Sequence, residues 1–482
     1  MDNQIRKQLE AYIDAHTGEM LEDIMRLCRI DSIRDTAAEG KPYGAGPYAA
    51  LAEAGAICSS YGFRTAYYDN RVMTADLEGS APCLDILAHM DVVAAGEGWT
   101  KTAPFEPKLI GDVLYGRGSS DDKGPAMAAL YAMRAVKELG IPLKGRCRLI
   151  LGSDEENGSS DLPYYYAKEK EAPMSFSPDA EFPVINIEKG QFRGTVRLDY
   201  AEDGKSDESG KVRLILAESG DTINIVPQKA LAVLAGIPEE AVLSAADEVR
   251  RETGAAFTAE AKMTVLEETG EKACRLLVSG KPAHASKPQE GVNAAVLLLL
   301  ILSKVHTDGA GWQEAVRKLS ALFPYGDHEG HGLGIAASDP ASGSTSISMD
   351  ILKIRDGRME AFFDARTCIS ANEANTVYPL RERLEKDGMT FSHTFNPPHA
   401  VDGESHFVQT LISCYEEVTG KKGECVAIGG GTYVHELQNG VAFGAVGAET
   451  DTHMHGADEF MPVLELQDAA LIYALAIVRL CG

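Results

Sequence analysis

Side chains that can bind a divalent cation stand at the ends of several short apolar runs in the sequence. His89 and Asp91 follow the run 83–88, and Asp179 lies in the segment 176–183. Imidazole and carboxylate groups together suit Zn²⁺, and also Mn²⁺ or Co²⁺. Each residue alone has a simpler interpretation, such as a helix cap or a solvated strand end. The complete set of candidates is His89, Asp91, Asp121, Asp122, Asp154, Glu155, Glu156, Asp179 and His455.

The number of candidate ligands exceeds what one metal ion needs. We therefore expect two metal ions about 3.5–4 Å apart, with one carboxylate between them. Two cations at that separation repel strongly, and a shared anion offsets the repulsion. Of the adjacent Glu155 and Glu156, one can bind metal while its neighbour takes a proton from water. Asp91 is two residues from His89 and could hold the second ring nitrogen of that imidazole.

Buried strands and one strong helix are expected to position these groups. Residues 83–89 and 146–152 are largely apolar, which is typical of strands inside a parallel sheet. The segment 125–140 between them has the periodicity of a helix. Strand, helix and strand in this order predict a doubly wound α/β layer, whose ligands bind at the carboxyl ends of the strands. His89 and the run 154–157 stand at those ends.

The pattern changes near residue 190, where strand pairs begin to alternate with helices. Helices are predicted at 238–254 and 292–305 between such strand pairs. This order suggests a second, α+β domain built from one or two ferredoxin-like units. The α/β pattern returns near residue 400, so the second domain is interpreted as an insertion into the first. The expected domains are 1–190 together with 396–482, and 191–395 between them.

Composition and charge limit the classes of protein to consider. A chain of 482 residues is too long for a single compact core, which fits two domains. A formal net charge of −26 argues against nucleic acid and anionic membranes as partners. The longest apolar run, 294–302, is too short to span a membrane. Nine scattered cysteines without a C-x-x-C pair, and an N-terminus without a signal-peptide pattern, favour the cytoplasm.

Five separated motifs together resemble those of a known enzyme family. In this order they are similar to the dinuclear zinc aminoacylase/carboxypeptidase/carnosinase metallopeptidase family, and within it to the PepV-type dipeptidase branch. The resemblance extends from about residue 10 to the C-terminus. It implies a doubly wound zinc-peptidase catalytic domain with an inserted α+β lid domain of ferredoxin-like units. The motifs are AHMD (88–91), GRGSSDDKGP (116–125), SDEEN (153–157), SPDAEFP (177–183) and HGADE (455–459).

The resemblance implies a role for each candidate around the metal centre. Asp121 would bridge two Zn²⁺ ions, and Glu155 would be the general base. Alternatives remain at two positions, because Asp122 could replace Asp121 and His453 could replace His455. Motif position and spacing favour Asp121 and His455. The implied ligands are His89, Asp121 and Asp179 for one ion and Asp121, Glu156 and His455 for the other, with Asp91 orienting His89.

The resemblance also implies substrate contacts from the inserted lid and from a glycine-rich loop. A lid histidine would reach the scissile carbonyl oxygen, and other lid residues would help to hold the substrate. Simpler interpretations remain, namely an exposed histidine, a surface ion pair and a tight turn. The residues concerned are His284, Asn224 and Arg366 in the lid, and Gly430 and Thr432 in the loop 429–433.

The function expected from the metal motifs is hydrolysis of dipeptides by a metal-dependent peptidase, with a small peptide as the partner. An amidohydrolase of N-acyl amino acids, of the deacylase or desuccinylase type, could use the same metal centre. A catalytically silent metal-binding protein on the same fold would need a lost ligand or base, and none is missing. The long insertion favours dipeptides and, by the resemblance, a monomer.

Overall fold

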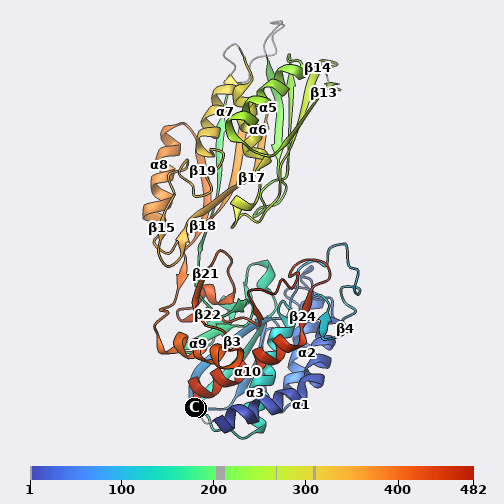
Figure 1. The fold of residues 1–482 in the computed structure, drawn as a ribbon, viewed down its shortest axis with the longest axis vertical. Coiled ribbons are helices and arrows are strands. Elements are labelled where there is room, and N and C mark those ends of the chain that lie inside the picture. Colours follow the sequence, from blue (N-terminus) through green and yellow to red (C-terminus); the bar gives the residue numbers. More distant parts are fainter. Residues whose placement is uncertain (1–2, 202–211, 268, 308–310) are drawn as a thin grey trace. The chain divides into compact units, whose positions relative to one another are not determined.

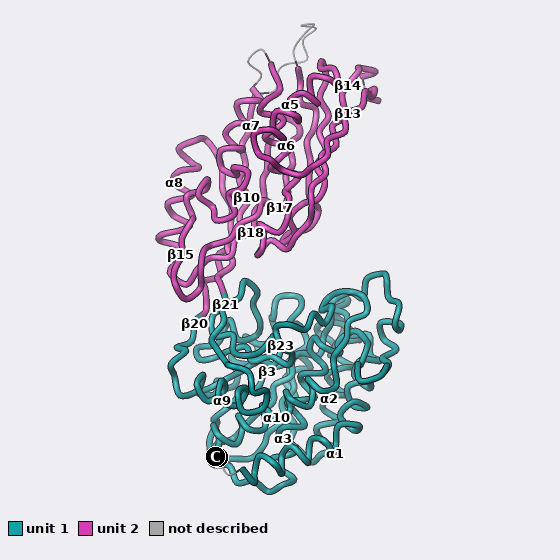
Figure 2. The backbone as a smooth tube through the Cα atoms, in the orientation of Figure 1, with its two compact units in different colours: residues 1–188, 400–482 teal, residues 189–399 magenta. Residues whose placement is uncertain are grey.

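The computed structural model describes residues 3–201, 212–267, 269–307 and 311–482. The chain divides into two compact units (Figure 2): residues 1–188 with 400–482, and residues 189–399. The sequence pattern predicts junctions after residues 190 and 395, and the compact units meet after residues 188 and 399.

The first unit is built on a nine-stranded mixed sheet. Its central strands β3, β6 and β7 run parallel to one another, and β22 runs parallel to β7. In spatial order the strands are β1 (Arg64–Tyr68), β2 (Val72–Leu77), β6 (Gly145–Gly152), β3 (Ala81–His89), β7 (Met174–Ser177), β22 (Gly440–Ala442), β9 (Val184–Glu188) and β20 (His399–Ala400), with β21 (Cys425–Ile428) paired to β9.

Both faces of this sheet are covered, which explains the largely apolar strands of the sequence (Figure 1). Successive residues of β3 point to opposite faces, so Ile86 and Ala88 join one hydrophobic cluster while Leu87 joins another. The first cluster contains helices α1 (Asn3–Cys28), α2 (Ala45–Ser60), α3 (Lys123–Glu138), α9 (His406–Thr419) and α10 (Val463–Cys481), and the second contains α4 (Asp161–Tyr166) and the 3₁₀ helix η4 (Tyr433–Glu436).

The apolar spacing of Ile5, Leu9 and Ile13, and that of Met20, Ile24, Leu27 and Cys28, predicts two separate helices, whereas the structure has the single helix α1. Its buried face continues through the polar segment between them, from Leu9 and Ile13 to Met20 and Ile24. Leu9 and Met20 are eleven residues apart, which is close to three full turns, so one helix keeps both on the same side.

The second unit contains one continuous antiparallel sheet of eight strands, with order β13-β14-β12-β11-β17-β18-β10-β19. The sequence of residues 192–220 predicts antiparallel strands with a polar break, and this break falls largely on residues 202–211, outside the described residues. The two strands of this segment, β10 and β11, are not neighbours in the sheet. The strands are β10 (Gly190–Asp199), β11 (Arg213–Ser219), β12 (Lys229–Ala235), β13 (Thr258–Val265), β14 (Lys272–Ser279), β17 (Ser346–Arg355), β18 (Arg358–Thr367) and β19 (Thr390–Asn396).

The helices of the second unit pack against its sheet to form a single large hydrophobic cluster. An α/β unit interrupted by an α+β unit is the fold class predicted from the sequence, and the structure confirms it. The helices are α5 (Glu239–Thr253), α6 (Ala294–Lys304), α7 (Gly311–Leu322) and α8 (Tyr378–Lys386), the last preceded by a π-helical turn, η3 (Glu373–Val377).

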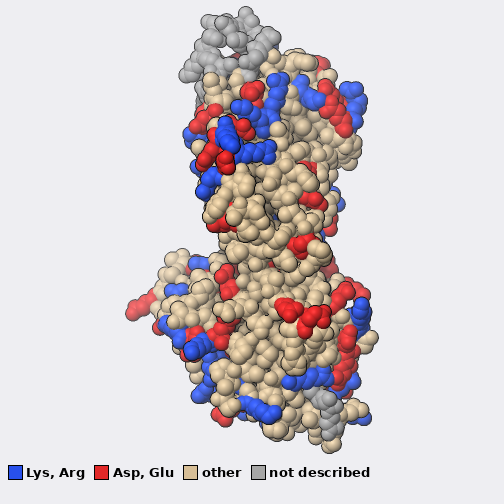
Figure 3. All heavy atoms as spheres, turned by 90° about the vertical axis from the view of Figure 1, so that its left-hand side faces the viewer, with Lys and Arg blue, Asp and Glu red and all other residues tan. Residues whose placement is uncertain are grey.

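Shorter elements complete both units. Among the described residues, no helix combines the length and apolar character needed to cross a membrane. Acidic and basic side chains of the described residues are interspersed on the face drawn in Figure 3. The remaining elements are β4 (Lys108–Ile110), β5 (Val113–Tyr115), β8 (Glu181–Phe182), β15 (Ser338–Asp339), β16 (Gly343–Ser344), β23 (Val446–Gly447), β24 (Phe460–Pro462), η1 (Glu155–Asn157) and η2 (Pro288–Glu290).

A buried acid in β3 predicts how stability changes with pH. Asp85 is 4% exposed, and burial raises its pKa to about 6 although Tyr166 and the Ala172 N–H donate to it. A carboxyl whose pKa is higher in the folded chain stabilises the fold below its unfolded pKa, and that contribution is lost as pH rises through the folded value. Asp85→Asn should therefore gain up to about 3 kcal/mol relative to wild type between pH 4 and pH 7.

Denaturant unfolding of both proteins at several pH values measures this difference. Glu10→Gln, on the exposed side of α1, is the control and should change stability by less than about 0.5 kcal/mol. A difference between Asp85→Asn and wild type that does not change with pH would contradict the prediction.

Candidate metal centre

The parallel strands of the first unit bring several polar side chains to one edge of the sheet. His89 is the last residue of β3, and Glu155 and Glu156 form the start of η1, just after β6. Asp179 follows β7. Because these strands run in the same direction, their carboxyl ends lie together, as expected for ligand sites of α/β sheets.

Asp121 lies between the two histidines predicted to bind metal. One carboxylate oxygen, Oδ1, is 2.9 Å from Nε2 of His89, and the other, Oδ2, is 2.8 Å from Nε2 of His455. Asp121 stands just before helix α3, and its side chain is 5% exposed. Each oxygen of one buried aspartate therefore faces a different imidazole.

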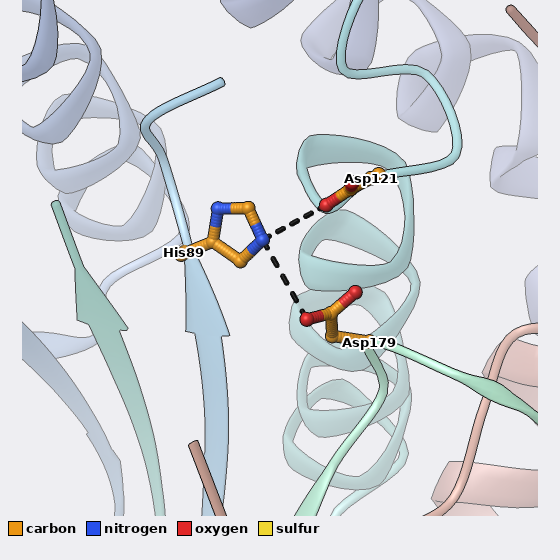
Figure 4. A group of neighbouring side chains, drawn as sticks. All are labelled: His89, Asp121 and Asp179. Carbon is orange, nitrogen blue, oxygen red and sulfur yellow. Dashed lines mark ion pairs between the residues drawn. The ribbon is translucent and has the colours of Figure 1, made fainter. Parts of the chain in front are cut away.

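The surrounding carboxylates complete two groups of potential metal ligands that share Asp121. Asp179 Oδ2 is 3.7 Å from Nε2 of His89 (Figure 4), and Glu156 Oε1 is 3.4 Å from Nε2 of His455. Within each group the ligand atoms all lie within 4.8 Å of one another. The groups have the membership that the sequence motifs imply, and binding of metal by them stays a prediction. They are His89, Asp121 and Asp179, and Asp121, Glu156 and His455.

The chemistry of these groups fits divalent cations. Nε2 of His89 and Oε1 of Glu156 are buried, and neither has a hydrogen-bond partner of acceptable geometry among the described residues. A buried polar atom without a partner is costly, and a metal ion would satisfy it. The atoms converge on common points and form a mixed nitrogen and oxygen set of the kind that binds Zn²⁺, Mn²⁺ or Co²⁺.

Asp91 organises this site differently from the sequence expectation. Nδ1 of His89 is 3.0 Å from the backbone carbonyl oxygen of Asp91 and 3.5 Å from its carboxylate. The carboxylate oxygens instead accept the backbone N–H groups of Glu155 and Glu156, at 3.2 Å each. Asp91 therefore orients the imidazole through its backbone and fixes the start of η1 through its side chain.

The two alternative ligands have other contacts. Asp122 Oδ2 accepts the backbone N–H of His89 at 3.1 Å, and the side chain belongs to neither ligand group. The ring of His453 packs against Phe460, with 5.5 Å between ring centroids, and it too is outside both groups. The geometry thus favours Asp121 and His455 at the two positions that the sequence left open.

The electric field at both histidines attracts positive charge. The neighbouring carboxylates of Asp121 and Glu156 raise the pKa of His455 to about 10. Burial lowers the pKa of His89, but the neighbouring carboxylates outweigh it and the net direction is upward. Metal ligation requires neutral imidazole, so a cation would compete with protons for these nitrogen atoms.

Glu155 lies beside the ligands without belonging to either group. Burial raises the pKa of its carboxyl well above the usual value, and the charges of Asp179 and Glu156 add to this effect. A carboxylate that gains a proton readily is suited to general base catalysis at neutral pH.

Sequence reasoning missed a buried acid that anchors the glycine-rich loop. Glu188 ends β9 and is fully buried. Its Oε1 accepts the N–H of Thr432 at 3.1 Å and the hydroxyl of Thr432 at 2.9 Å, and its Oε2 lies 3.0 Å from Nδ1 of His435. The polar groups of Thr432 are thus held by the protein. Gly430 and Thr432 stay predicted substrate contacts.

A second buried acid joins the same loop to the metal ligands. Asp161 Oδ2 accepts the hydroxyl of Tyr433 at 2.6 Å and the backbone N–H groups of Ser153 and Asp154 at the end of β6. The Tyr433 ring meets the imidazole of His89 edge-on, with 6.3 Å between centroids.

In the second unit, the structure pairs two of the predicted substrate residues. Ile225 and His284 form an isolated antiparallel bridge, and the Ala285 N–H donates to the carbonyl of Asn224 at 2.8 Å. The backbone N–H of Ser286 donates to Nδ1 of the exposed His284 at 3.1 Å. Nδ1 is therefore an acceptor, which places the ring proton on Nε2 when the imidazole is neutral.

Arg366 lies on β18, opposite Ser346 of β17 and Gln191 of β10. It is 6% exposed, and its Nε donates to Asp364 Oδ1 at 2.8 Å. The ion pair considered from the sequence is therefore present, but it is buried rather than on the surface.

Comparison with known proteins identifies the family. A family model described as Peptidase family M20/M25/M40 matches residues 86–479. The chain belongs to this peptidase family. The resemblance drawn from five motifs is thereby confirmed, and so is the predicted enzyme class, a metallopeptidase.

Relatives of this M20-family chain match it along nearly their whole length. It is 32% identical to a putative dipeptidase, YtjP, of Bacillus subtilis over 96% of this chain and 97% of the relative. It is 33% identical to the Beta-Ala-Xaa dipeptidase of Lactobacillus delbrueckii subsp. lactis over 100% and 99%.

Solved structures share the fold of this peptidase. Human carnosine dipeptidase 1 aligns with a TM-score of 0.54 at 15% identity, covering 99% of both chains. An M20 family metallo-carboxypeptidase from Sulfolobus solfataricus aligns with a TM-score of 0.57 at 17% identity, covering 96% of this chain and 99% of the other.

Proposed function

We propose that this peptidase hydrolyses dipeptides with two divalent cations held by the two ligand groups. The observation that carries the proposal is Asp121, whose two oxygens face His89 and His455 at 2.9 and 2.8 Å. One shared anion between two imidazoles is the arrangement that would offset the repulsion of two neighbouring cations. Zn²⁺ is the proposed metal, with Mn²⁺ or Co²⁺ as substitutes.

Bound cations would polarise the scissile carbonyl and acidify a water molecule. Glu155 is proposed as the general base that takes the proton from this water and passes it to the leaving amine. Distinct roles for these neighbours are supported by the ligand groups, of which one contains Glu156 and neither contains Glu155. Glu156 then serves as a ligand while Glu155 is reserved for proton transfer.

His284 is proposed to donate a hydrogen bond from Nε2–H to the carbonyl oxygen of the substrate as negative charge develops on that oxygen. The Ser286 N–H at Nδ1 supports this role, because it selects the tautomer that can donate. Asn224, Arg366, Gly430 and Thr432 stay proposed substrate contacts. A cytoplasmic location and a monomeric state are also proposals, carried over from the sequence.

Replacing His284 with Ala should lower kcat by about 10²–10³-fold, the usual effect of removing one oxyanion donor. The metal content should stay at the wild-type value because His284 belongs to neither ligand group. His331→Ala, a change at an exposed histidine of the same unit, is the matched control and should keep full activity. Wild-type kcat in His284→Ala would exclude this role.

The names of the relatives support dipeptides over N-acyl amino acids as substrates. The two relatives described above are named as dipeptidases, and this chain matches each of them over nearly its full length. The metal ligands alone do not separate these substrates. Hydrolysis of a free dipeptide should exceed that of an N-acetyl amino acid by at least about 100-fold in kcat/KM, because a buried polar group left unpaired costs roughly this factor or more. Faster turnover of the N-acetyl amino acid would reverse the assignment.

A further inference from the structure

A buried ion pair stands directly behind the proposed metal centre. Arg117 is 1% exposed and Glu459 is fully buried, and Nη1 of the arginine lies 2.5 Å from Oε2 of the glutamate. The two residues are 342 positions apart in the chain. They belong to the segments that also carry Asp121 and His455.

Glu459 accepts hydrogen bonds from the loop 118–121, which ends at the shared Asp121. Its Oε1 accepts the backbone N–H groups of Gly118, Ser120 and Asp121 at 3.0, 2.9 and 3.3 Å. It also accepts the hydroxyl of Ser120 at 3.1 Å. A single buried oxygen atom with this many donors fixes the backbone at Asp121.

Arg117 holds the segment that carries the second histidine. Its Nη2 donates to the carbonyl oxygens of His455 at 3.2 Å and Gly456 at 3.1 Å. His455 has a φ of +64°, a backbone conformation that a residue other than glycine keeps only where its surroundings impose it. The His455 side chain is 53% exposed, so packing of the ring contributes little to its position.

We propose that the Arg117–Glu459 pair is a positioning device for the second cation, that of Asp121, Glu156 and His455. This inference rests on the proposed two-cation function. The pair contacts the backbone of two of the three ligands in that group. In the first group, His89 and Asp179 follow sheet strands, and among the described residues no hydrogen bond joins either of them to the pair. Asp121 belongs to both groups, but His455, whose carbonyl oxygen Arg117 holds, belongs to the second group alone. Loss of the pair should therefore weaken the second cation site more than the first.

Titration of the metal-free protein with Zn²⁺ against a chromogenic chelator tests this assignment. Wild type should bind two equivalents. Glu459→Gln should bind one equivalent with near wild-type affinity and the other about 10–100-fold more weakly, the usual effect of losing a partner that orients a ligand. Arg117→Lys should behave similarly, since an ammonium group lacks the fork that reaches both Glu459 and the two carbonyls.

A second buried pair in the same unit provides the matched control. Arg148 Nε lies 2.7 Å from Asp76 Oδ1, and both residues are 6% exposed. Asp76→Asn should reduce thermal stability and leave both Zn²⁺ equivalents at wild-type affinity. A near-ultraviolet circular dichroism spectrum confirms folding of each variant, and Arg117→Lys decides the question if Glu459→Gln does not fold.

The inference is overturned if both folded variants bind two equivalents with wild-type affinity. Equal weakening of both equivalents, also seen in Asp76→Asn, would overturn it as well, because that pattern reflects general destabilisation. Fewer than two equivalents in wild type would instead reject the proposed two-cation function.

Discussion

Glu155→Gln should lower kcat by about 10²–10⁴-fold while the protein keeps both metal ions. General base catalysis contributes a factor of this size, and an amide cannot take the proton. The substitution preserves the shape of the side chain, and the backbone N–H of residue 155 can still donate to Asp91. Because Glu155 is outside both ligand groups, the metal sites should remain intact.

Steady-state kinetics on a dipeptide, with metal content measured on the same sample, checks this expectation. Glu156→Gln is the matched control because it changes the adjacent residue on η1 in the same way. That variant should lose affinity for one metal ion. Near-normal turnover of metal-loaded Glu155→Gln would reject the proposed general base.

Asp121→Asn should affect both metal ions, since both ligand groups contain this residue. The amide carries no charge, so the repulsion between two cations about 3.5–4 Å apart would no longer be offset. We expect affinity for the second equivalent of Zn²⁺ to fall by more than about 100-fold, beyond the effect of losing a residue that only orients a ligand. Hydrolysis should fall in parallel.

Asp122→Asn is the control for this experiment, because it makes the same change one residue along the chain. Its amide oxygen can still accept the backbone N–H of His89, as the carboxylate does at 3.1 Å. Asp122→Asn should therefore bind two equivalents. The reverse result, with two equivalents in Asp121→Asn and loss in Asp122→Asn, would assign the shared position to Asp122.

The arrangement of the site could be anticipated wherever a rule of sheet geometry applied. His89, Glu156 and Asp179 follow or end parallel strands, and such strands bring their carboxyl ends to one edge. The largely apolar pattern of β3 and β6 identified these strands because both faces are buried. Residues on regular elements were therefore predictable as a set.

The contacts of buried acids were not predictable, because they depend on long-range backbone positions. Asp91 binds the N–H groups of η1, and Glu188 binds Thr432, which is 244 residues away. The Glu459 carboxylate likewise meets Arg117 across 342 residues. No local periodicity marks such partners, since a carboxylate in a loop looks the same in the sequence whether it faces water or a backbone amide.

At α1 the local sequence pattern gave a wrong prediction, because the structure has one continuous helix instead of two. A polar stretch between two apolar patterns suggested an interruption. The helix continues because Leu9 and Met20 stay on one buried face over about three turns. Tertiary packing thus outweighed local composition at this position.

The most direct test of the central proposal is anomalous X-ray diffraction from crystals of the Zn²⁺-loaded protein. We predict two zinc peaks about 3.5–4 Å apart, with one oxygen of Asp121 bound to each ion, His89 at the first and His455 at the second. A single zinc ion at this site, or two ions of which only one contacts Asp121, would contradict the account.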